Sequence, residues 1–448
     1  WQVAVEYLLA GTHGSCTLLP SFCQRRTTLL RQSLDPYLMT KADAAVTAPA
    51  KLSRSSFFIL ITGLLANAIG QAFIFAILPP LGREVALSEI QTTSIISTSA
   101  LLFTFCSPWW GRKSDQIGRK IVIVIGLTGY AVGTVVFAAV FALGMKGILT
   151  GWTLYFTALV CRCMQSSLMA ATSPGVTAYA ADHSSRAFRT QTLARLGTAN
   201  SLGLIIGPVV AGLLAGLGLL FPLYVAAFLT FIAVFVVWKY LPEGEHPGPS
   251  RKQVPRLSFL DARLRVYLLS AIGTFTGFSA IQQTLGFRIQ DSLSLSGVET
   301  AQYTGAALMV SAFFTLALQL SVSQRYTGPA LNLVRMGLVA NLVAAGVIAL
   351  ADNLTGLLVG MAFMGAGLGL LGPAMSAGAS LAVSRDEQGG AAGLITACPA
   401  AGFVIGPVLG GALYQISPTY PPLFAGLVTL IVLSYAMKKR ENLIAEED

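Results

Sequence analysis

Charged residues are scarce in this sequence. Of its 448 residues only 11% are Asp, Glu, Lys or Arg, whereas 54% are hydrophobic. A soluble globular protein carries about 25% charged residues, so this composition excludes that class. The few charges gather between apolar runs of about twenty residues, the length that crosses a hydrocarbon core about 30 Å thick. The sequence therefore predicts an integral membrane protein in a lipid bilayer, and its net charge of +10 lies in loops, where it favours an orientation signal over nucleic-acid binding.

Histidine and cysteine are also rare, with three and six residues. The cysteines form no CxxC pair and have no histidine at a zinc-binding spacing, so we expect neither a metal site nor a disulfide framework. The sequence also contains no nucleophile elbow and no phosphate-binding glycine loop. These absences predict a protein that is not an enzyme, needs no cofactor and does not use ATP.

Twelve apolar stretches follow one another along the chain. Each is long enough to cross the bilayer as a helix whose backbone groups bond internally, as lipid requires. We predict spans at about 55–80, 88–110, 120–143, 151–180, 191–217, 219–241, 265–287, 299–323, 329–351, 354–382, 389–415 and 418–437.

Basic residues are unevenly divided between the two sets of loops that join these spans. One set carries twenty-two Lys and Arg residues, and the other carries only Arg83, Lys146 and Arg288. The positive-inside rule places the basic loops in the cytoplasm. We therefore expect both termini in the cytoplasm and the protein in a bacterial cytoplasmic (inner) membrane.

The sequence repeats itself once, at an offset of 199 residues. GLIIGPVVAG at 203–212 returns as GFVIGPVLGG at 402–411, and the same offset aligns Pro174 with Pro373. A repeat of this length indicates two related halves, an arrangement known in secondary transporters. We expect an all-α membrane protein with twelve transmembrane helices in two pseudo-symmetric six-helix bundles.

Hydrophilic segments suggest where the parts of the chain begin and end. Residues 242–264 contain four prolines and are mostly basic where charged, which is typical of a cytoplasmic linker between halves at 55–241 and 265–438. Residues 439–448 form a cytoplasmic tail. Residues 1–54 form an N-terminal extension and cytoplasmic leader, in which we expect translation to start at Met39; a targeting sequence before that residue is the alternative.

A glycine-bounded basic segment, GRKSDQIGRK, lies at 111–120 between the second and third predicted spans. It resembles the loop signature of the major facilitator superfamily, with departures at Lys113, Ser114 and Gln116. Its glycines allow a tight turn and close helix approach, and its acid can meet a helix N-terminus or a cation. The resemblance implies a cytoplasmic latch between the halves, whereas an ordinary basic loop is the alternative. The matching residues are Gly111, Asp115, Gly118, Arg119 and Lys120.

Arg162 is the one charged residue placed deep within a predicted span, the fourth. Its burial costs at least about 2.5 to 3.5 kcal/mol, so it should face the bundle interior and a partner. Gln165 lies near the same helix face. The segment Arg162-Cys-Met-Gln165 resembles the fourth-helix motif associated with proton transfer in antiporters of the superfamily, with Ser166 in place of glycine. These two residues are the transport and coupling candidates, and a snorkelling arginine near a helix end is the alternative.

The repeated GxxxGPxxxG pattern places small residues four apart, which lets helix backbones approach closely. The first copy resembles the motif of the twelve-helix drug:proton antiporter branch, the multidrug and tetracycline efflux type, with Ala211 where glycine is usual. The resemblance implies export; a glycine-rich packing face with no role in export is the alternative. The motif residues are Gly203, Gly207, Pro208 and Gly212 in the first copy and Gly402, Gly406, Pro407 and Gly411 in the second.

Polar residues in the first and seventh predicted spans are candidates for a substrate cavity. Asn67 and Gln71 lie one turn apart, and Gln282 and Gln283 are adjacent. Hydrogen bonding between helices is the alternative role for each. The resemblance implies a carrier that works as a monomer and moves a small-molecule substrate by alternating access to a central site.

The first predicted span has no Asp or Glu, although many proton-coupled exporters of this superfamily carry an acid there. The residue that would bind the proton is therefore unidentified. We expect a proton-driven exporter of small amphipathic molecules, a type of protein that can confer drug resistance. An exporter or facilitator of an organic anion, such as a carboxylate metabolite or siderophore, is the alternative that Arg162 favours. A non-transporting membrane receptor or assembly factor on a carrier fold is a third.

Overall fold

The computed structural model describes residues 53–184, 186–243, 257–384 and 387–439. The described residues all belong to one compact unit of the chain, Leu52–Asp448. The expected start at Met39 and nearly all of the tail lie outside the described residues. Over the described ranges the regular structure is helical, without strands.

The helices follow the predicted spans closely. The first half contains α4 (Arg54–Glu84), α5 (Glu89–Ile117), α6 (Arg119–Met145), α7 (Gly151–Met169), α8 (Thr172–Asp182), α9 (Arg186–Ala215) and α10 (Phe221–Tyr240). The second half contains α11 (Arg265–Leu293), α12 (Gly297–Leu318) with a π-helical turn η1 (Gln319–Ser323), α13 (Ala330–Leu350), α14 (Leu354–Leu381), α15 (Gln388–Ile416) and α16 (Tyr420–Lys438).

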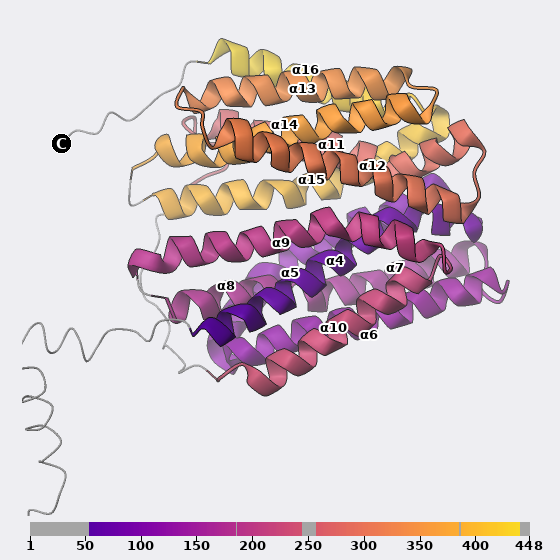
Figure 1. Cartoon of the computed structure of the whole chain (residues 1–448), viewed down its shortest axis with the longest axis horizontal. Coiled ribbons are helices and arrows are strands. Elements are labelled where there is room, and N and C mark those ends of the chain that lie inside the picture. Colours follow the sequence, from indigo (N-terminus) through magenta and orange to yellow (C-terminus); the bar gives the residue numbers. More distant parts are fainter. Residues whose placement is uncertain (1–52, 185, 244–256, 385–386, 440–448) are drawn as a thin grey trace, which may run out of the picture. The chain divides into compact units, whose positions relative to one another are not determined.

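The two halves pack their helices in the same pattern (Figure 1). In the first half α4 packs against α9 and α10, and α10 also packs against α6. In the second half the helices in the same chain order repeat these pairs, since α11 packs against α15 and α16, and α16 against α13. The predicted fold, twelve spans in two pseudo-symmetric six-helix bundles, is confirmed.

The fourth span differs from its prediction because it is two helices rather than one. Helix α7 ends at Met169 and α8 begins at Thr172. Pro174 explains the break, since it has no N–H to donate to the carbonyl of Ala170 and its ring clashes with the turn before it. The related Pro373 lies inside the unbroken α14, so the same residue does not end that helix.

Several helices continue beyond the predicted span ends. Helix α4 runs through Pro79 and Pro80 to Glu84, and α11 runs to Leu293. The helix that follows each begins at a capping box, formed by Ser88 with Gln91 and by Ser296 with Glu299. These boxes satisfy backbone N–H groups at the helix start. As a result the 84–89 and 293–297 connections are short, and both lie at the same end of the bundle.

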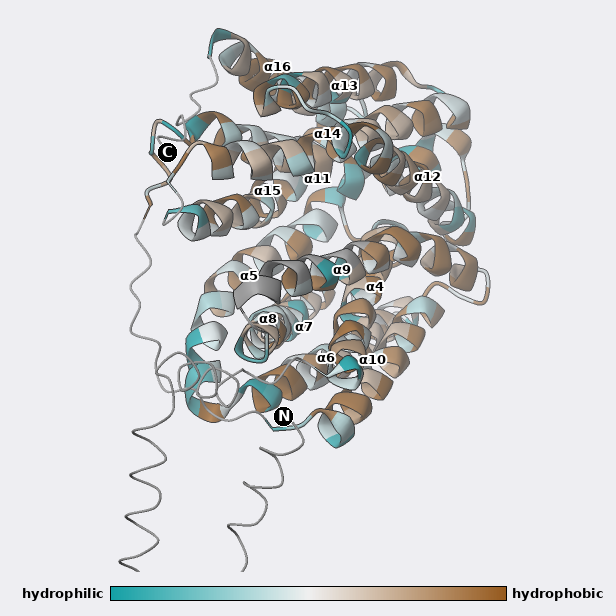
Figure 2. Ribbon diagram, turned by 60° about the vertical axis from the view of Figure 1, so that its left-hand side comes forward, coloured by the Kyte–Doolittle hydropathy of each residue, from teal (hydrophilic) through white to brown (hydrophobic). Residues whose placement is uncertain are grey.

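Hydropathy is not uniform among the spans. Nine helical segments in the described part of the chain are long and apolar enough to cross a membrane. The three spans that fall short are α5, α7 with α8, and α11. Figure 2 shows hydrophobic colour along most of the helices and hydrophilic colour mainly near their ends. The less apolar spans carry Arg162 and the Gln282–Gln283 pair, so polar groups are concentrated where helices face one another.

Candidate functional site

Arg162 is buried among three helices of the first half. Its side chain is 1% exposed. Its Nη1 donates to Gln165 Oε1 on α7 at 2.6 Å, and its Nη2 donates to Gln71 Oε1 on α4 at 2.9 Å. The structure thus joins one predicted cavity residue to the predicted coupling pair. Both acceptors are neutral amide oxygens, so they do not compensate the positive charge of the guanidinium.

Gln165 is itself fixed by α6. Its Nε2 donates to Thr134 Oγ1 at 2.6 Å and to the Tyr130 carbonyl at 3.3 Å. Gly133 allows this approach, because a Cβ there would lie 2.6 Å from the Gln165 side chain. The chain of contacts therefore runs from α4 through Arg162 and Gln165 to α6.

Several buried polar atoms near the middle of the bundle lack a hydrogen-bond partner among the described residues. In the first half they are Arg162 Nε, the Tyr130 hydroxyl and Asn67 Oδ1. In α11 they are Gln282 Oε1 and Gln283 Nε2. Burying such groups unpaired costs free energy, so they mark places where water or a ligand would be stabilised.

The loop signature is placed differently from its prediction. Helix α5 continues to Ile117, so Gly111 is inside the helix and not in a turn. A Cβ on Gly111 would meet only Pro174, at 3.7 Å, so this glycine is not required for close packing. The turn uses Gly118 alone, whose φ of 99° favours glycine. The two glycines therefore have unequal roles.

Arg119 connects the charged residues of this signature. It pairs with Asp115 one turn earlier, and its Nε bonds Asp182 Oδ2 at the end of α8 at 3.0 Å. Its Nη1 also donates to Ser114 Oγ. These contacts stay within the first half. Lys120 follows Arg119 in α6 and is half-buried.

The two GxxxGPxxxG copies make equivalent contacts. A Cβ on Gly203 or Gly207 would strike α4, with Ala68 Cβ 2.6 Å and the Ile69 carbonyl 3.1 Å away respectively. In the second copy a Cβ on Gly402 would lie 2.5 Å from Phe275 Cβ of α11, and Gly406 also lies against α11. Each copy thus lets the fifth span of its half approach the first.

The last glycine of each copy contacts the opposite half. Gly212 lies against Gln302 of α12, whose Cα would be 3.2 Å from an added Cβ. Gly411 lies against α5, where the Glu89 carbonyl would be 3.0 Å away. Pro208 and Pro407 lie inside their helices beside these glycines. The motif therefore packs both within a half and across the interface between halves.

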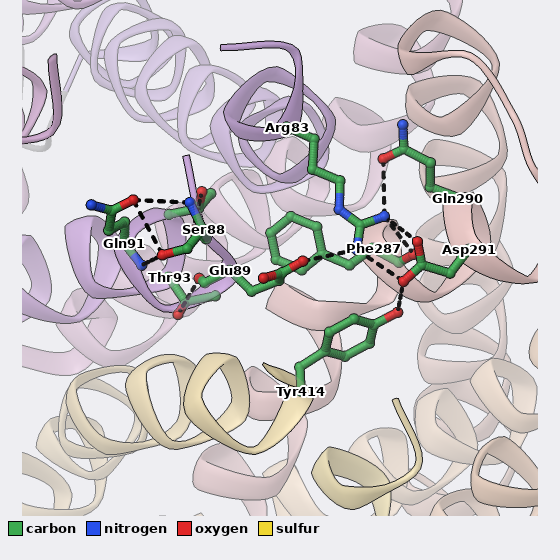
Figure 3. A network of polar contacts seen from close by, with 10 residues as sticks. Arg83, Ser88, Glu89, Gln91, Thr93, Phe287, Gln290, Asp291 and Tyr414 are labelled. Carbon is green, nitrogen blue, oxygen red and sulfur yellow. Dashed lines mark hydrogen bonds and ion pairs between the residues drawn. The ribbon is translucent and has the colours of Figure 1, made fainter. Parts of the chain in front are cut away.

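Charged residues at one end of the bundle form a second polar cluster, the Arg83 cluster, made by Arg83, Glu89, Asp291 and Tyr414 (Figure 3). The Arg83 guanidinium lies between a carboxylate of each half, with Nη2 2.9 Å from Glu89 Oε1 and 2.9 Å from Asp291 Oδ2. The Tyr414 hydroxyl donates to Asp291 Oδ2 at 2.7 Å. Arg83 therefore ties α4 to α5 in its own half and to α11 in the other.

The other contacts of Arg83 also reach the second half. Its Nη1 donates to Gln290 Oε1 and to the Phe287 carbonyl, both at 3.4 Å, and its Cζ lies 5.0 Å from the centre of the Phe287 ring. Deeper in the same interface, Phe75 of α4 stacks on Phe403 of α15 with centroids 5.3 Å apart. Contacts between the halves therefore extend from the Arg83 cluster at this end to the Phe75–Phe403 pair deeper in the bundle.

The fold and these motifs can be compared with known proteins. Residues 60–351 and 321–443 match the Major Facilitator Superfamily. The chain belongs to this superfamily. Its members are transporters, so this superfamily protein is a multi-pass membrane carrier for small molecules and not an enzyme.

Relatives of this superfamily protein carry drug-resistance names. It is 25% identical over 401 residues to "Multidrug resistance protein 2" of Bacillus subtilis (strain 168), which covers 87% of this chain and 96% of the relative. It is 28% identical over 381 residues to "Tetracycline resistance protein, class G" of Vibrio anguillarum, covering 81% and 91%. The predicted resemblance to the multidrug and tetracycline efflux type is confirmed.

A solved structure agrees with the fold of this superfamily protein. A bacterial homologue of the human lysosomal transporter Spinster, in an inward-facing and occupied conformation, has a TM-score of 0.69 at 15% sequence identity. It covers 86% of this chain and 96% of that chain. The likeness concerns the arrangement of the helices.

The sequence prediction missed the Arg83 cluster. The predicted first span stops at residue 80, so the sequence offered no reason to place Arg83 beside residues of the second half. One signal was available, since Arg83 and Arg288 are two of only three basic residues in the loops on the side where this cluster lies. Basic residues on the side that the positive-inside rule leaves poor in Lys and Arg are candidates for specific ion pairs.

Proposed function

We propose that this protein is a secondary active transporter that exports small amphipathic organic molecules by alternating access, driven by protons. The observation that carries this proposal is its similarity to drug-resistance proteins over more than four-fifths of the chain, in both halves. The equivalent packing of the two GxxxGPxxxG copies fits the two related halves that alternating access requires.

The proposed orientation follows the distribution of basic residues. The Arg119 end of the bundle carries most of them, so we place this end and both termini in the cytoplasm of a bacterial cell, with the protein in the inner membrane. The Arg83 cluster then faces outward. We retain 55–241 and 265–438 as the two halves and 242–264 as their linker, in a protein that functions as a monomer.

The ion pairs at the two ends fit one state of an alternating-access cycle. At the outward end Arg83 pairs with both halves. At the cytoplasmic end Arg119 pairs with Asp115 and Asp182 within the first half, and Arg263, at the end of the linker, pairs with Glu387 of the second. This is the pattern expected of a carrier closed to the outside, with the loop signature disengaged from the opposite half.

The proposed substrate path lies between α4 and α11. Asn67, Gln71, Gln282 and Gln283 lie on these helices, and three of them carry buried polar atoms without partners among the described residues. Such atoms would bind a substrate's polar groups, while Phe75 and Phe403 would contact its apolar surface. This combination suits amphipathic molecules.

Everted membrane vesicles energised to an acidic interior test this function. Addition of tetracycline or ethidium should release protons from the vesicles, because entry of the compound is exchanged for exit of protons. A transmembrane potential supplies about 2.3 kcal/mol per charge per 100 mV, enough to drive a measurable gradient. Vesicles without the protein are the control. If neither these nor a wider panel of amphipathic compounds evokes proton release, proton-coupled export is excluded.

Transport of an organic anion is a second candidate, favoured by Arg162. Its guanidinium is buried, its Nε has no partner, and none of the described carboxylates forms an ion pair with it. A buried cation of this kind would be stabilised by a substrate carboxylate. Uptake of radiolabelled salicylate into the same vesicles tests this candidate. Uptake of salicylate without proton release by tetracycline or ethidium would favour the organic anion over the first candidate.

A further inference from the structure

The Arg83 cluster contains one more carboxylate than guanidinium. Arg83 is shared by Glu89 of the first half and Asp291 of the second. With Arg83, Glu89 and Asp291 all ionised, these three groups carry a net charge of −1. Two interacting carboxylates in such a cluster take up protons as a pair. One proton therefore makes the three groups neutral.

The helix ends distinguish the two carboxylates. Glu89 is the first residue of α5, where the positive end of the helix dipole stabilises an anion. Asp291 is in the last turn of α11, where the dipole disfavours an anion. Asp291 is also the more exposed, with 43% of its side chain accessible against 22% for Glu89. Water can deliver a proton to Asp291, and its ionised form depends more on Arg83.

Other charged and titratable groups surround the cluster at this end. Tyr414 of α15 donates its hydroxyl to Asp291. Arg288, one turn earlier on α11, donates to the carbonyls of Pro418, Ala349 and Ala351. Glu299 of α12 is bound in its capping box. Glu84 of α4 lies beside Gly297, and Asp352 lies between α13 and α14 near Arg288.

We propose that Asp291 is the carboxylate that takes up the coupling proton from outside and thereby opens the outward end of the carrier. This inference rests on the proposed function and identifies the coupling residue that the first span lacks. A proton from external water forms an O–H bond on the Asp291 carboxylate, and the ion pair with Arg83 is lost. Arg83 stays paired with Glu89 in its own half, so no buried cation is left unpaired. The ionic link between halves is lost, and only the longer 3.4 Å bonds from Arg83 to Gln290 and to the Phe287 carbonyl oppose opening.

Protonation of the other ion pairs among the described residues would not open the interface between the halves. Arg119 pairs with Asp115 and Asp182 within the first half. Arg263, at the end of the linker, pairs with Asp261 of the linker and Glu387 of the second half. Protonating any of those acids would change no bond between halves. Among the described carboxylates, Asp291 is the one in an ion pair that crosses the interface.

Hydrogen–deuterium exchange of the full chain in lipid nanodiscs tests this gate without any substrate. The readout is amide exchange in peptides covering 79–93 and 286–300, at one neutral pH. Asp291→Asn should raise exchange in both peptides by about tenfold or more, because the charge-assisted link is lost. Glu89→Gln leaves the Arg83–Asp291 pair intact and should exchange like wild type, as should Glu299→Gln, a control at the same end within one half.

The pH dependence gives the second part of the test. After correction for intrinsic exchange, the wild-type rate should rise as the pH falls from about 8 to about 5, and Asp291→Glu should behave the same way. Asp291→Asn should show no such rise. Arg83→Gln removes the guanidinium that pairs with Asp291 and should also raise exchange in both peptides. This variant replaces Asp291→Asn in the test if Asp291→Asn does not fold. The proposal would be overturned if Asp291→Asn and Arg83→Gln exchanged at the wild-type rate. It would also be overturned if Glu89→Gln raised exchange as much as Asp291→Asn does.

Transport separates this inference from the proposed function. If wild type moves none of the compounds tested, export fails while the exchange result still decides whether Asp291 controls the gate. If wild type exports tetracycline or ethidium, Asp291→Asn should lose accumulation driven by the pH gradient. Gradient-driven export that persists in Asp291→Asn would reject Asp291 as the coupling residue and leave export standing.

Discussion

Arg162 and Arg288 are two buried guanidinium groups with different kinds of partner. Arg162 bonds two amide oxygens, and its Nε has no partner among the described residues. Arg288 bonds three backbone carbonyls at the end of α13 and in the turn before α16. Carbonyls at a helix end need donors, so Arg288 has a structural role. The Nε atoms of both arginines lack a partner among the described residues. Arg162, which is held by side-chain amides and not by helix-end carbonyls, is the candidate for a ligand.

Arg162 should be essential for transport of the substrate. Arg162→Ala removes the buried charge and should abolish transport, whereas Arg162→Lys keeps the charge without the planar donors and should retain part of it. Initial rates of tetracycline and salicylate transport in vesicles measure this, with Cys163→Ala as the control at the next position. Wild-type rates for both compounds in Arg162→Ala would contradict the role.

Arg288 should instead be essential for stability. Arg288→Ala leaves buried carbonyls without donors, a loss on the order of 2 kcal/mol for hydrogen bonds to a charged group. The melting temperature of the purified protein should fall, while Arg83→Ala, whose partners are more exposed, should lower it less. An unchanged melting temperature in Arg288→Ala would show that water replaces the side chain.

Sequence reasoning reached some of these residues and not others. The burial of Arg162 followed from hydropathy, and its proximity to Gln165 followed from helical periodicity. Its bond to Gln71 could not be predicted from local sequence patterns, because the two residues are 91 positions apart in the chain. Arg83 and Asp291 are 208 residues apart, and only the packing of the two halves brings them together.

Glycine positions determine how closely the helices approach. Gly207 and Gly406 occupy related places, each against the first helix of its half. The 199-residue repeat predicted this equivalence, but not which helices each copy would contact. Sequence patterns also misjudged ends, since the helical propensity of 111–117 continued α5 through the expected loop, and Pro174 divided a span.

Gly406→Ala should destabilise the second half. The added methyl would meet the Ser279 side chain and the Thr276 carbonyl, with the Ala280 nitrogen 3.0 Å away. Overpacking of this kind costs about 1–3 kcal/mol. Gly372→Ala is the matched control, because no atom lies within 4 Å of the new Cβ. Thermal unfolding in detergent should separate the two variants, and equal melting temperatures would contradict close packing at Gly406.

The pair of Arg263 and Glu387 should be insensitive to physiological pH. Hydrogen bonds from Arg263, followed by those from Ser384, lower the pKa of Glu387 to about 2. A lowered carboxyl pKa stabilises the fold above the unfolded pKa, and this contribution disappears as the pH falls through the folded value. The melting-temperature difference between wild type and Glu387→Gln should therefore stay constant from about pH 5 to about pH 9. A difference that shrinks within this range would show that Glu387 titrates there.

The whole molecule combines a symmetric scaffold with an asymmetric set of charges. Composition, span length and the internal repeat were sufficient to predict twelve helices in two halves, because those features depend on local hydropathy. The charges depend on how the halves meet. Arg83 joins them at one end. At the other end Arg119 binds within the first half, and Arg263 of the linker binds the second half. A carrier that alternates between two closures requires such a difference between its ends.

Export against a gradient by the purified protein tests the central claim most directly. The protein would be reconstituted into liposomes with an acidic interior and neutral exterior, and accumulation of tetracycline and ethidium would be followed over time. Proton-driven antiport predicts accumulation above the external concentration, its collapse when a protonophore removes the pH gradient, and its absence in protein-free liposomes. Equilibration without accumulation, or accumulation that survives loss of the gradient, would contradict it.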